Sequence, residues 1–324
     1  MMKTQINMTT SFCDLDRFAS QEELLALLGD EGIELTCYEE DVRGIIPKDR
    51  VVGLHMNCLP YWYAFWRGDM AACLREFDNM ETVCAVFGGK TPESLLAHYR
   101  RDLDLAKRYG AEYMVFHVCD GSIEETFTGK SRHTDAEVID AAADLLNELF
   151  SGVEDGPWLL LENLWYAGLR FTDPEMTERL LSRVKYPKTG LMLDTGHLLH
   201  TNTKLKTQEE GVRYIESMLD LHGPLTRYIR GVHLNQSLTG ARMEEQHAHP
   251  PVLADTYAKR NEQLFWYVFS VDLHEPFTCP GVPELIERIA PDYLTYELIS
   301  RDLDEHRALL TAQREVFKKN QKDS

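Results

Sequence analysis

The sequence is short of several features that would place it in the membrane or outside the cell. No apolar run approaches the about 20 residues that a membrane-spanning helix needs. The first 18 residues, MMKTQINMTTSFCDLDRF, contain no apolar core of the kind found in secretory signals. The seven cysteines are odd in number and include no CxxC pair, which is typical of reduced thiols. We therefore expect a cytoplasmic protein with no membrane segment.

Positive charge is also scarce. The 324 residues include 34 Lys and Arg against 53 Asp and Glu, a formal net charge of −19. Such an acidic chain repels phosphate backbones. We expect a small-molecule substrate and no nucleic-acid partner. Nothing in the sequence decides the oligomeric state, and a homo-oligomer is compatible with it.

Eight short, nearly continuous apolar runs alternate with helical patterns along the chain. Such runs are typical of parallel strands covered on both faces. Capping-box patterns mark helix starts at Ser20, Thr134, Thr172 and Thr207, and Thr91-Pro92 marks another. No GxGxxG follows the first run, which disfavours a dinucleotide-binding sheet. We predict an α/β chain folded as a single (β/α)₈ TIM barrel domain over residues 1–324. The runs cover residues 6–12, 33–38, 51–56, 113–118, 158–161, 190–193, 229–234 and 293–298.

Two connections depart from a regular barrel. The segment EDVRGIIPKDR between the second and third strands is short and holds a Gly and a Pro, so its helix should be rudimentary. The connection between the seventh and eighth strands is much longer than one crossover helix requires. We expect a long loop there, a helix over part of residues 255–269, and a short helix at 283–289.

Polar residues stand where six successive strands end. A barrel collects the carboxyl ends of its strands around one axis. Carboxylates placed that close repel one another unless a cation lies between them. Together with histidine they form the ligand set of zinc or manganese, and we expect one to three divalent ions. The residues are His55, His117, Glu162, Asp194 with His197 three residues later, His233 and Glu297.

The loop after the seventh strand offers further candidates. We expect Glu245 and His247 to supply metal ligands, although Glu244 competes with the former and His249 with the latter. Asn235, two residues beyond His233, is a candidate substrate ligand.

The aromatic segment PYWYAFWRGD follows the third strand. It predicts either a hydrophobic lid or a stacking wall for substrate, with Trp62 and Trp66 as the contacts. Arg67, Arg170 and Arg242 lie in loops of the same side, where each can hold an anion or pair with a surface carboxylate.

The segments LENLWYAG, LDTGHLLHT, HLNQSLTGAR and YEL resemble the xylose isomerase-like TIM barrels. That superfamily includes sugar-phosphate isomerases and epimerases and the AP endonuclease family 2, or endonuclease IV, group. The resemblance implies that Glu162, Asp194, His233 and Glu297 are the shared ligands. It also favours Arg242 as the anion ligand.

The endonuclease branch adds further ligands to this core. They are His on the third and fourth strands, His after the sixth-strand Asp, and an Asp-x-His in the loop after strand seven. These fall on His55, His117, His197 and, less cleanly, on Glu245 with His247, where Glu replaces Asp.

Three functions follow from these residues. The first is a metal-dependent isomerase or epimerase of a sugar or polyol, phosphorylated or not. In it Glu162 and Glu297 exchange a proton beside a polarised carbonyl, and His197 orients a hydroxyl or binds a second ion. The second is a multinuclear zinc phosphoesterase like endonuclease IV, which the additional histidines favour. The third is a metal-retaining binding barrel with no turnover.

Overall fold

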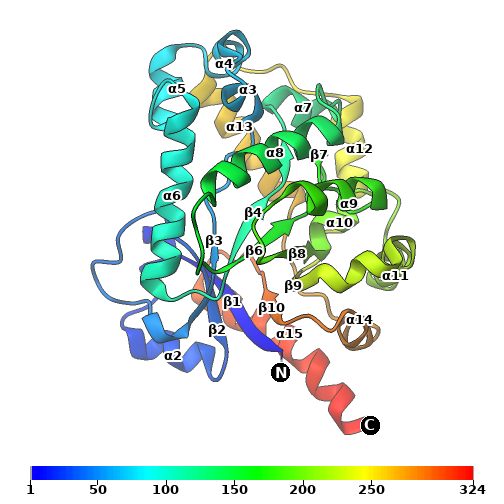
Figure 1. The fold of residues 1–324 in the computed structure, drawn as a ribbon. Coiled ribbons are helices and arrows are strands. Elements are labelled where there is room, and N and C mark those ends of the chain that lie inside the picture. The colour runs from blue at the N-terminus through cyan, green and yellow to red at the C-terminus, as the bar shows by residue number, and fades with distance from the viewer. Residues whose placement is uncertain (1, 324) are drawn as a thin grey trace.

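The computed structural model describes residues 2–323, except the side chains of residues 319–323. Eight parallel strands close into a barrel in the order β1-β10-β9-β8-β6-β4-β3-β2 (Figure 1), which confirms the predicted TIM barrel. The first strand lies about three residues earlier than predicted, because Ser11 caps a short helix that takes Phe12. The strands are β1 (Lys3–Thr9), β2 (Gly32–Thr36), β3 (Val51–His55), β4 (Tyr113–His117), β6 (Trp158–Glu162), β8 (Thr189–Asp194), β9 (Ile229–Leu234) and β10 (Tyr293–Tyr296).

Helices surround the barrel, and several begin where the capping patterns predict (Figure 1). Thr134 and Thr207 form complete capping boxes, and Thr91 precedes a helix closed by Gly110 in the left-handed conformation (φ 71°). Ser20 is an N-cap residue, but its side chain makes no capping hydrogen bond. The prediction at Thr172 is wrong by one residue: the Asp173 carboxylate accepts from the Glu175 amide at 2.9 Å.

The helices before β9 are α1 (Phe12–Leu15), α2 (Gln21–Leu28), α3 (Tyr63–Trp66), α4 (Met70–Phe77), α5 (Met80–Phe87), α6 (Pro92–Tyr109), α7 (Ile123–Thr128), α8 (Asp135–Leu149), α9 (Pro174–Arg183), α10 (Thr195–His200) and α11 (Gln208–His222). A two-stranded antiparallel ribbon, β5 (Cys119–Asp120) with β7 (Ala167–Gly168), lies outside the barrel. A 3₁₀ segment, η2 (Gly223–Tyr228), leads from α11 into β9.

The two irregular connections are where they were predicted. Between β2 and β3 the described chain forms only one 3₁₀ turn, η1 (Lys48–Arg50). A groove of about 670 Å³ remains there, between residues 37–48 and α6. Between β9 and β10 lie α12 (Gly240–Ala248), α13 (Tyr257–Val271) and α14 (Val282–Ile289), and α15 (Leu303–Asp323) ends the fold.

The helices α13 and α14 confirm two of the predicted elements, but the loop predicted across residues 240–248 is wrong. Its sequence, GARMEEQHA, is rich in good helix formers. Met243 gives this helix an apolar anchor, since it packs in a cluster with Phe127, Tyr267 and Val271.

The barrel interior is apolar at its amino end and polar at its carboxyl end. Tyr113, Val115, Leu160, Met192 and Tyr293 form the apolar cluster. Gly53 leaves room for Tyr113, because a Cβ there would lie 2.1 Å from its ring. This apolar cluster therefore closes the barrel beneath its polar carboxyl end, which we call the mouth. All seven cysteines are unpaired. Within residues 2–323 no helix combines the length and apolarity needed to cross a membrane.

Candidate metal centre

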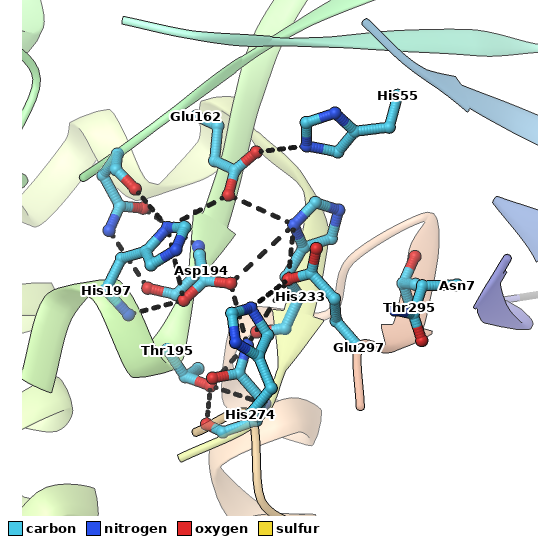
Figure 2. Close-up of polar contacts among 12 residues, drawn as sticks. Asn7, His55, Glu162, Asp194, Thr195, His197, His233, His274, Thr295 and Glu297 are labelled. Atoms are coloured by element: carbon cyan, nitrogen blue, oxygen red, sulfur yellow. Dashed lines mark hydrogen bonds and ion pairs between the residues drawn. The ribbon is translucent and has the colours of Figure 1, made fainter. Parts of the chain in front are cut away.

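Glu162, at the end of β6, lies at the centre of the polar mouth. Its Oε2 is 3.1 Å from His55 Nε2 and 3.0 Å from His117 Nε2. Its Oε1 is 3.2 Å from His197 Nδ1 and 3.3 Å from His233 Nδ1. Figure 2 shows the carboxylate with His197 to its left and with His55 and His233 to its right. Each oxygen thus faces its own pair of imidazoles, as a carboxylate that bridges two ions does.

The strand register explains why these side chains meet. His117 is paired with Glu162 across β4 and β6, and Asp194 with His233 across β8 and β9. Each of these strands ends at or one residue beyond its ligand, so the side chains point into the mouth at one level. Asp194 also caps α10 by accepting from the His197 amide at 2.6 Å, which fixes that histidine beside it.

Four overlapping sets of side chains can each hold an ion, and within each set the ligand atoms lie within 4.8 Å of one another. One of them is Glu34, His55, His233 and Glu297, in which Glu34 already contacts His233 Nε2. The other three are the histidine, carboxylate and loop groups. The histidine group is His55, His117 and Glu162. The carboxylate group is Glu162, Asp194, His233 and Glu297. The loop group is Asp194, His197 and His274. Glu162 belongs to two of these sets and Asp194 to two, so the groups adjoin one another.

The sequence analysis missed two residues here, one in the loop group and one that contacts it. Asp272 and His274 directly follow α13, and both are buried. Asp272 Oδ2 lies 3.5 Å from His197 Nε2, and His274 Nε2 lies 3.4 Å from Glu297 Oε2. Asp272-Leu273-His274 has the Asp-x-His spacing that was assigned to Glu245 and His247. This spacing was the signal by which the sequence could have identified Asp272 and His274 as candidate ligands.

The structure does not bring Glu245 and His247 to the mouth. Both lie on α12, where residues two apart do not face the same way. Glu245 is exposed, and His247 lies beside Gly129 at a separate cavity of about 380 Å³. The alternatives fail too: Glu244 pairs with Lys204, and His249 is exposed. None of these four belongs to an ion-holding group found among the described residues.

Contacts with the residues that follow β9 hold the Asp272–His274 segment in place. Ser237 Oγ accepts from the amides of Leu273 (2.8 Å) and His274 (3.2 Å). Gln236 and Glu275 exchange backbone hydrogen bonds of 2.8 and 3.0 Å. His274 itself adopts a positive φ of 47°, a conformation that a non-glycine residue keeps only when its surroundings impose it.

Glu34, inside β2, is a second residue that the sequence analysis missed. Its Oε1 lies 2.8 Å from His233 Nε2, while Tyr113 and Thr295 donate to its Oε2 at 2.5 and 3.0 Å. Such a carboxylate fixes the ring and leaves His233 Nδ1 to face the ions. The signal was an acidic residue in the middle of a strand expected to be buried, GIELT.

Two buried atoms test whether ions fit these residues. Neither Glu162 Oε1 nor His233 Nδ1 has a hydrogen-bond partner in the described part of the chain, although they lie only 3.3 Å apart. Buried polar atoms are rarely left in this state. A carboxylate oxygen and an imidazole nitrogen at this separation are placed as two ligands of one divalent ion with bonds of about 2 Å. The residues present therefore fit a metal.

The charges of the mouth stabilise one another. Burial alone would lower the pKa of His117, but Glu162 outweighs it and raises that pKa to about 10. Burial raises the pKa of Asp194 to about 7, and the neighbouring Glu297 and Glu162 add to the rise while His197 opposes it. Burial would raise the pKa of Glu162, yet His117 and His233 hold it well below its usual value. A divalent ion would displace the histidine protons, because it binds neutral imidazole.

The expected substrate ligands are only partly at the mouth. Asn235 is buried there and donates to Asp194 Oδ2 at 2.8 Å. Trp62 is buried instead under α3, where its indole N–H donates to the Cys119 carbonyl at 2.7 Å. Trp66 packs against the core, and Arg242 is exposed and donates to Ser270 Oγ.

A cavity of about 620 Å³ opens at the mouth, and neither Trp62 nor Trp66 lines it. Phe265 and Phe269 of α13 supply its aromatic wall, so the insertion takes the place expected of the β3 segment. The hydrophobic-lid interpretation fits Trp62 and Trp66 better than the stacking wall does.

Comparison with known proteins agrees with this geometry. The family described as "Xylose isomerase-like TIM barrel" matches residues 58–298. A curated relative, "Probable endonuclease 4" of Halothermothrix orenii, is 31% identical over 176 residues, which cover 53% of this chain and 57% of that protein.

Solved structures of similar fold include a D-tagatose 3-epimerase-like protein, at 16% identity, TM-score 0.54, and 100% of both chains covered. Another is the mannonate dehydratase of Streptococcus suis serotype2, at 10% identity, TM-score 0.52, and 100% of this chain and 96% of that one covered. At these identities the likeness shows the fold alone.

Proposed function

Because the chain belongs to the xylose isomerase-like TIM barrel family, we propose that it is a metal-dependent enzyme whose multinuclear centre hydrolyses a phosphate ester. One observation carries this proposal. The histidine, carboxylate and loop groups bring nine candidate ligand residues together when Asp272 is counted with the loop group. The resemblance to the isomerases accounts only for the four of the carboxylate group.

Each group would hold one ion, with Glu162 shared between the first two and Asp194 between the last two. The donor set of imidazole nitrogens and carboxylate oxygens favours zinc, with manganese the alternative. Bound divalent ions would polarise a phosphoryl oxygen and lower the pKa of water.

The chain's own residues hold the ligands rigidly. Asn163 Oδ1 accepts from the Asp194 amide at 2.9 Å, and its Nδ2 donates to the Asp194 carbonyl at 3.0 Å. Asn235 then holds Asp194 Oδ2, while the His197 amide holds Oδ1. The shared carboxylate is thus oriented by hydrogen bonds to both of its oxygens, which is the support that metal ligands require.

The charge of the chain favours a small phosphate ester over a nucleic acid. The net charge is −19, and Arg17 is the only Arg or Lys among the described residues that line the mouth cavity. A nucleic-acid enzyme gains most of its non-specific affinity from several such contacts.

A second candidate is the sugar isomerase or epimerase. Glu162 and Glu297 both approach His233 Nδ1, at 3.3 and 3.2 Å, and Glu297 lines the cavity. Glu297 would then take a proton from the carbon beside a carbonyl, Glu162 would return one, and His197 would orient a hydroxyl.

One metal-loaded preparation can test both candidates. Its ion content is measured by mass spectrometry, and it is assayed for hydrolysis of bis(p-nitrophenyl) phosphate and for deuterium exchange next to the carbonyl of a panel of ketoses. We expect two or three ions and hydrolysis, with hydrolysis lost in Asp272→Asn and kept in the matched control Glu245→Gln.

Two results would overturn parts of the proposal. Exchange without hydrolysis, kept in Asp272→Asn and lost in Glu297→Gln, would establish the isomerase instead. Efficient incision of an abasic-site duplex at physiological salt would replace the small ester by DNA.

A further inference from the structure

The mouth cavity has a second polar corner, formed by Arg17, Ser300 and His306, which belong to none of the ion-holding groups. Histidines and carboxylates of those groups, among them His55, His274 and Glu297, line the same cavity. The proposed hydrolysis uses none of the three residues of the polar corner.

Arg17 is held in a fixed orientation at this corner. Its Nη1 donates to Ser300 Oγ at 3.1 Å and its Nη2 to the Ser300 carbonyl at 2.7 Å. Only 21% of its side chain is exposed, and its ion pair with Asp14 is long, at 3.4 Å. The Nε–H has no hydrogen-bond partner in the described chain. A guanidinium fixed in this way loses little entropy when it binds a planar anion.

His306 adds an unused polar atom to the corner. The residue is 4% exposed, its Nδ1 lies 3.1 Å from Ser300 Oγ, and its Nε2 is buried without a partner in residues 2–323. Burial, followed by the charge of Arg17, lowers the pKa of His306 to about 4. The ring is therefore neutral near pH 7 and able to donate or accept one hydrogen bond.

The distance between Glu297 of the ion-holding groups and Ser300 of the polar corner suits a small molecule. Ser300 follows Glu297 by three residues, so their backbones are at most about 11 Å apart. A single ligand about the size of a sugar can therefore reach both the ion-holding groups and Arg17. Phe265 and Phe269 line the cavity as well, and they give it apolar surface.

We propose that Arg17, with Ser300 and His306, is a subsite for a terminal anionic group of the substrate, a carboxylate or a phosphate, other than the group that reacts. The inference rests on the proposed function only in taking this cavity as the substrate site. It holds for a hydrolase and for an isomerase alike.

Equilibrium binding to the full metal-loaded chain tests the subsite without turnover. The probes are xylonate, the non-hydrolysable phosphonate analogue of xylitol 5-phosphate and the uncharged xylitol, measured by calorimetry. We expect at least one anionic probe to bind at least tenfold more tightly than xylitol, and the better of the two identifies the anion as carboxylate or phosphate. Arg17→Gln should abolish this preference. Arg301→Gln, which removes an exposed charge paired with Glu305, should leave it unchanged.

The preference could instead arise at the ions, and Arg17→Gln separates the two cases. A preference unchanged in Arg17→Gln, or none in the unmodified chain, would overturn the subsite. If Arg17→Gln fails to fold, as circular dichroism would show, Ser300→Ala replaces it. That variant should reduce the preference severalfold, and an unchanged preference in it overturns the proposal. An intact preference without hydrolysis would refute the proposed activity and leave the subsite standing.

Discussion

Two acid–histidine pairs with the same spacing occur in the insertion between β9 and β10, and only one reaches the ion-holding groups. Glu245 and His247 lie on α12 with the carboxylate exposed. Asp272 and His274 lie on an irregular segment that is hydrogen-bonded to Ser237, three residues after the end of β9, and both are buried. The two pairs have the same kinds of side chain at the same spacing. The conformation of the backbone therefore decides which pair reaches the ion-holding groups.

The comparison shows what turns a pair of ligand-type residues into ligands. A helix turns residues two apart to different sides, whereas an irregular segment with one positive φ can aim both at one centre. The positive φ of His274 strains the backbone of this segment. The contacts with Ser237 and Gln236 keep the segment in that conformation.

Removing one histidine from each pair is the most direct test. His274→Ala should lose one ion per chain and lower hydrolysis at least 100-fold, because the loop group keeps only two of its three members. His247→Ala should keep the full ion content and activity. Ion content by mass spectrometry and the rate of hydrolysis are the measurements. Equal losses in the two variants would mean that the pairs are equivalent after all.

A substitution at Glu34 tests whether a residue that orients a metal ligand matters as much as the ligand itself. Glu34→Gln keeps the size of the side chain but weakens the hold on His233 Nε2, so ion affinity should fall 10- to 100-fold. Competition with a chelator of known affinity gives the measurement. The control is Glu40→Gln, an exposed carboxylate outside the barrel interior. Unchanged affinity in Glu34→Gln would show that His233 is oriented by packing alone.

Ser237 tests the anchor of the loop. Ser237→Ala removes two hydrogen bonds to the amides of Leu273 and His274, each worth about 1 kcal/mol. We expect a loss of about tenfold in affinity for one ion only, with the rest unaffected. Thr226→Ala, which removes an exposed hydroxyl in η2, is the control. A loss spread over all ions would point to general unfolding of the mouth.

The smallest effect concerns a buried histidine outside the ion-holding groups. The pKa of His306 falls to about 4 in the folded chain from 6.5. Between these values the unfolded state binds more protons, so His306 destabilises the fold as pH drops from 6.5 to 4, by up to about 1.4 kcal/mol per pH unit. In chelator-treated protein, His306→Gln should flatten the unfolding free energy against pH in this window, whereas His249→Gln should not. Identical slopes would contradict the shift.

The barrel could be predicted from sequence because its strands are short apolar runs with a polar residue at the end. The same pattern gives the positions of Glu162, Asp194, His233 and Glu297. It fails for His274, which follows a helix, since the path of an irregular segment depends on tertiary contacts such as the hydrogen bond from the His274 amide to Ser237 Oγ.

Two further misses have other physical causes. Glu34 sits inside a strand between the apolar residues Ile33 and Leu35. Only the closed barrel shows that its side chain reaches His233. Trp62 was a candidate for the mouth because of its sequence position, but α3 turns it into the core. The local sequence pattern predicts the helices and strands and where they end. Where the side chains of the connecting segments lie can be seen only in the tertiary structure.

The missing helix between β2 and β3 has a consequence for how the barrel opens. Every other connection between consecutive barrel strands has at least one helix, whereas the described chain between β2 and β3 forms only η1, beside a groove lined by residues 37–48 and α6. Amide hydrogens of the β2–β3 ladder should therefore exchange with solvent through a smaller local opening than those between β6 and β8. Since Glu34 and His55 are on these strands, local opening of the seam between them would loosen their contacts with His233 and Glu162.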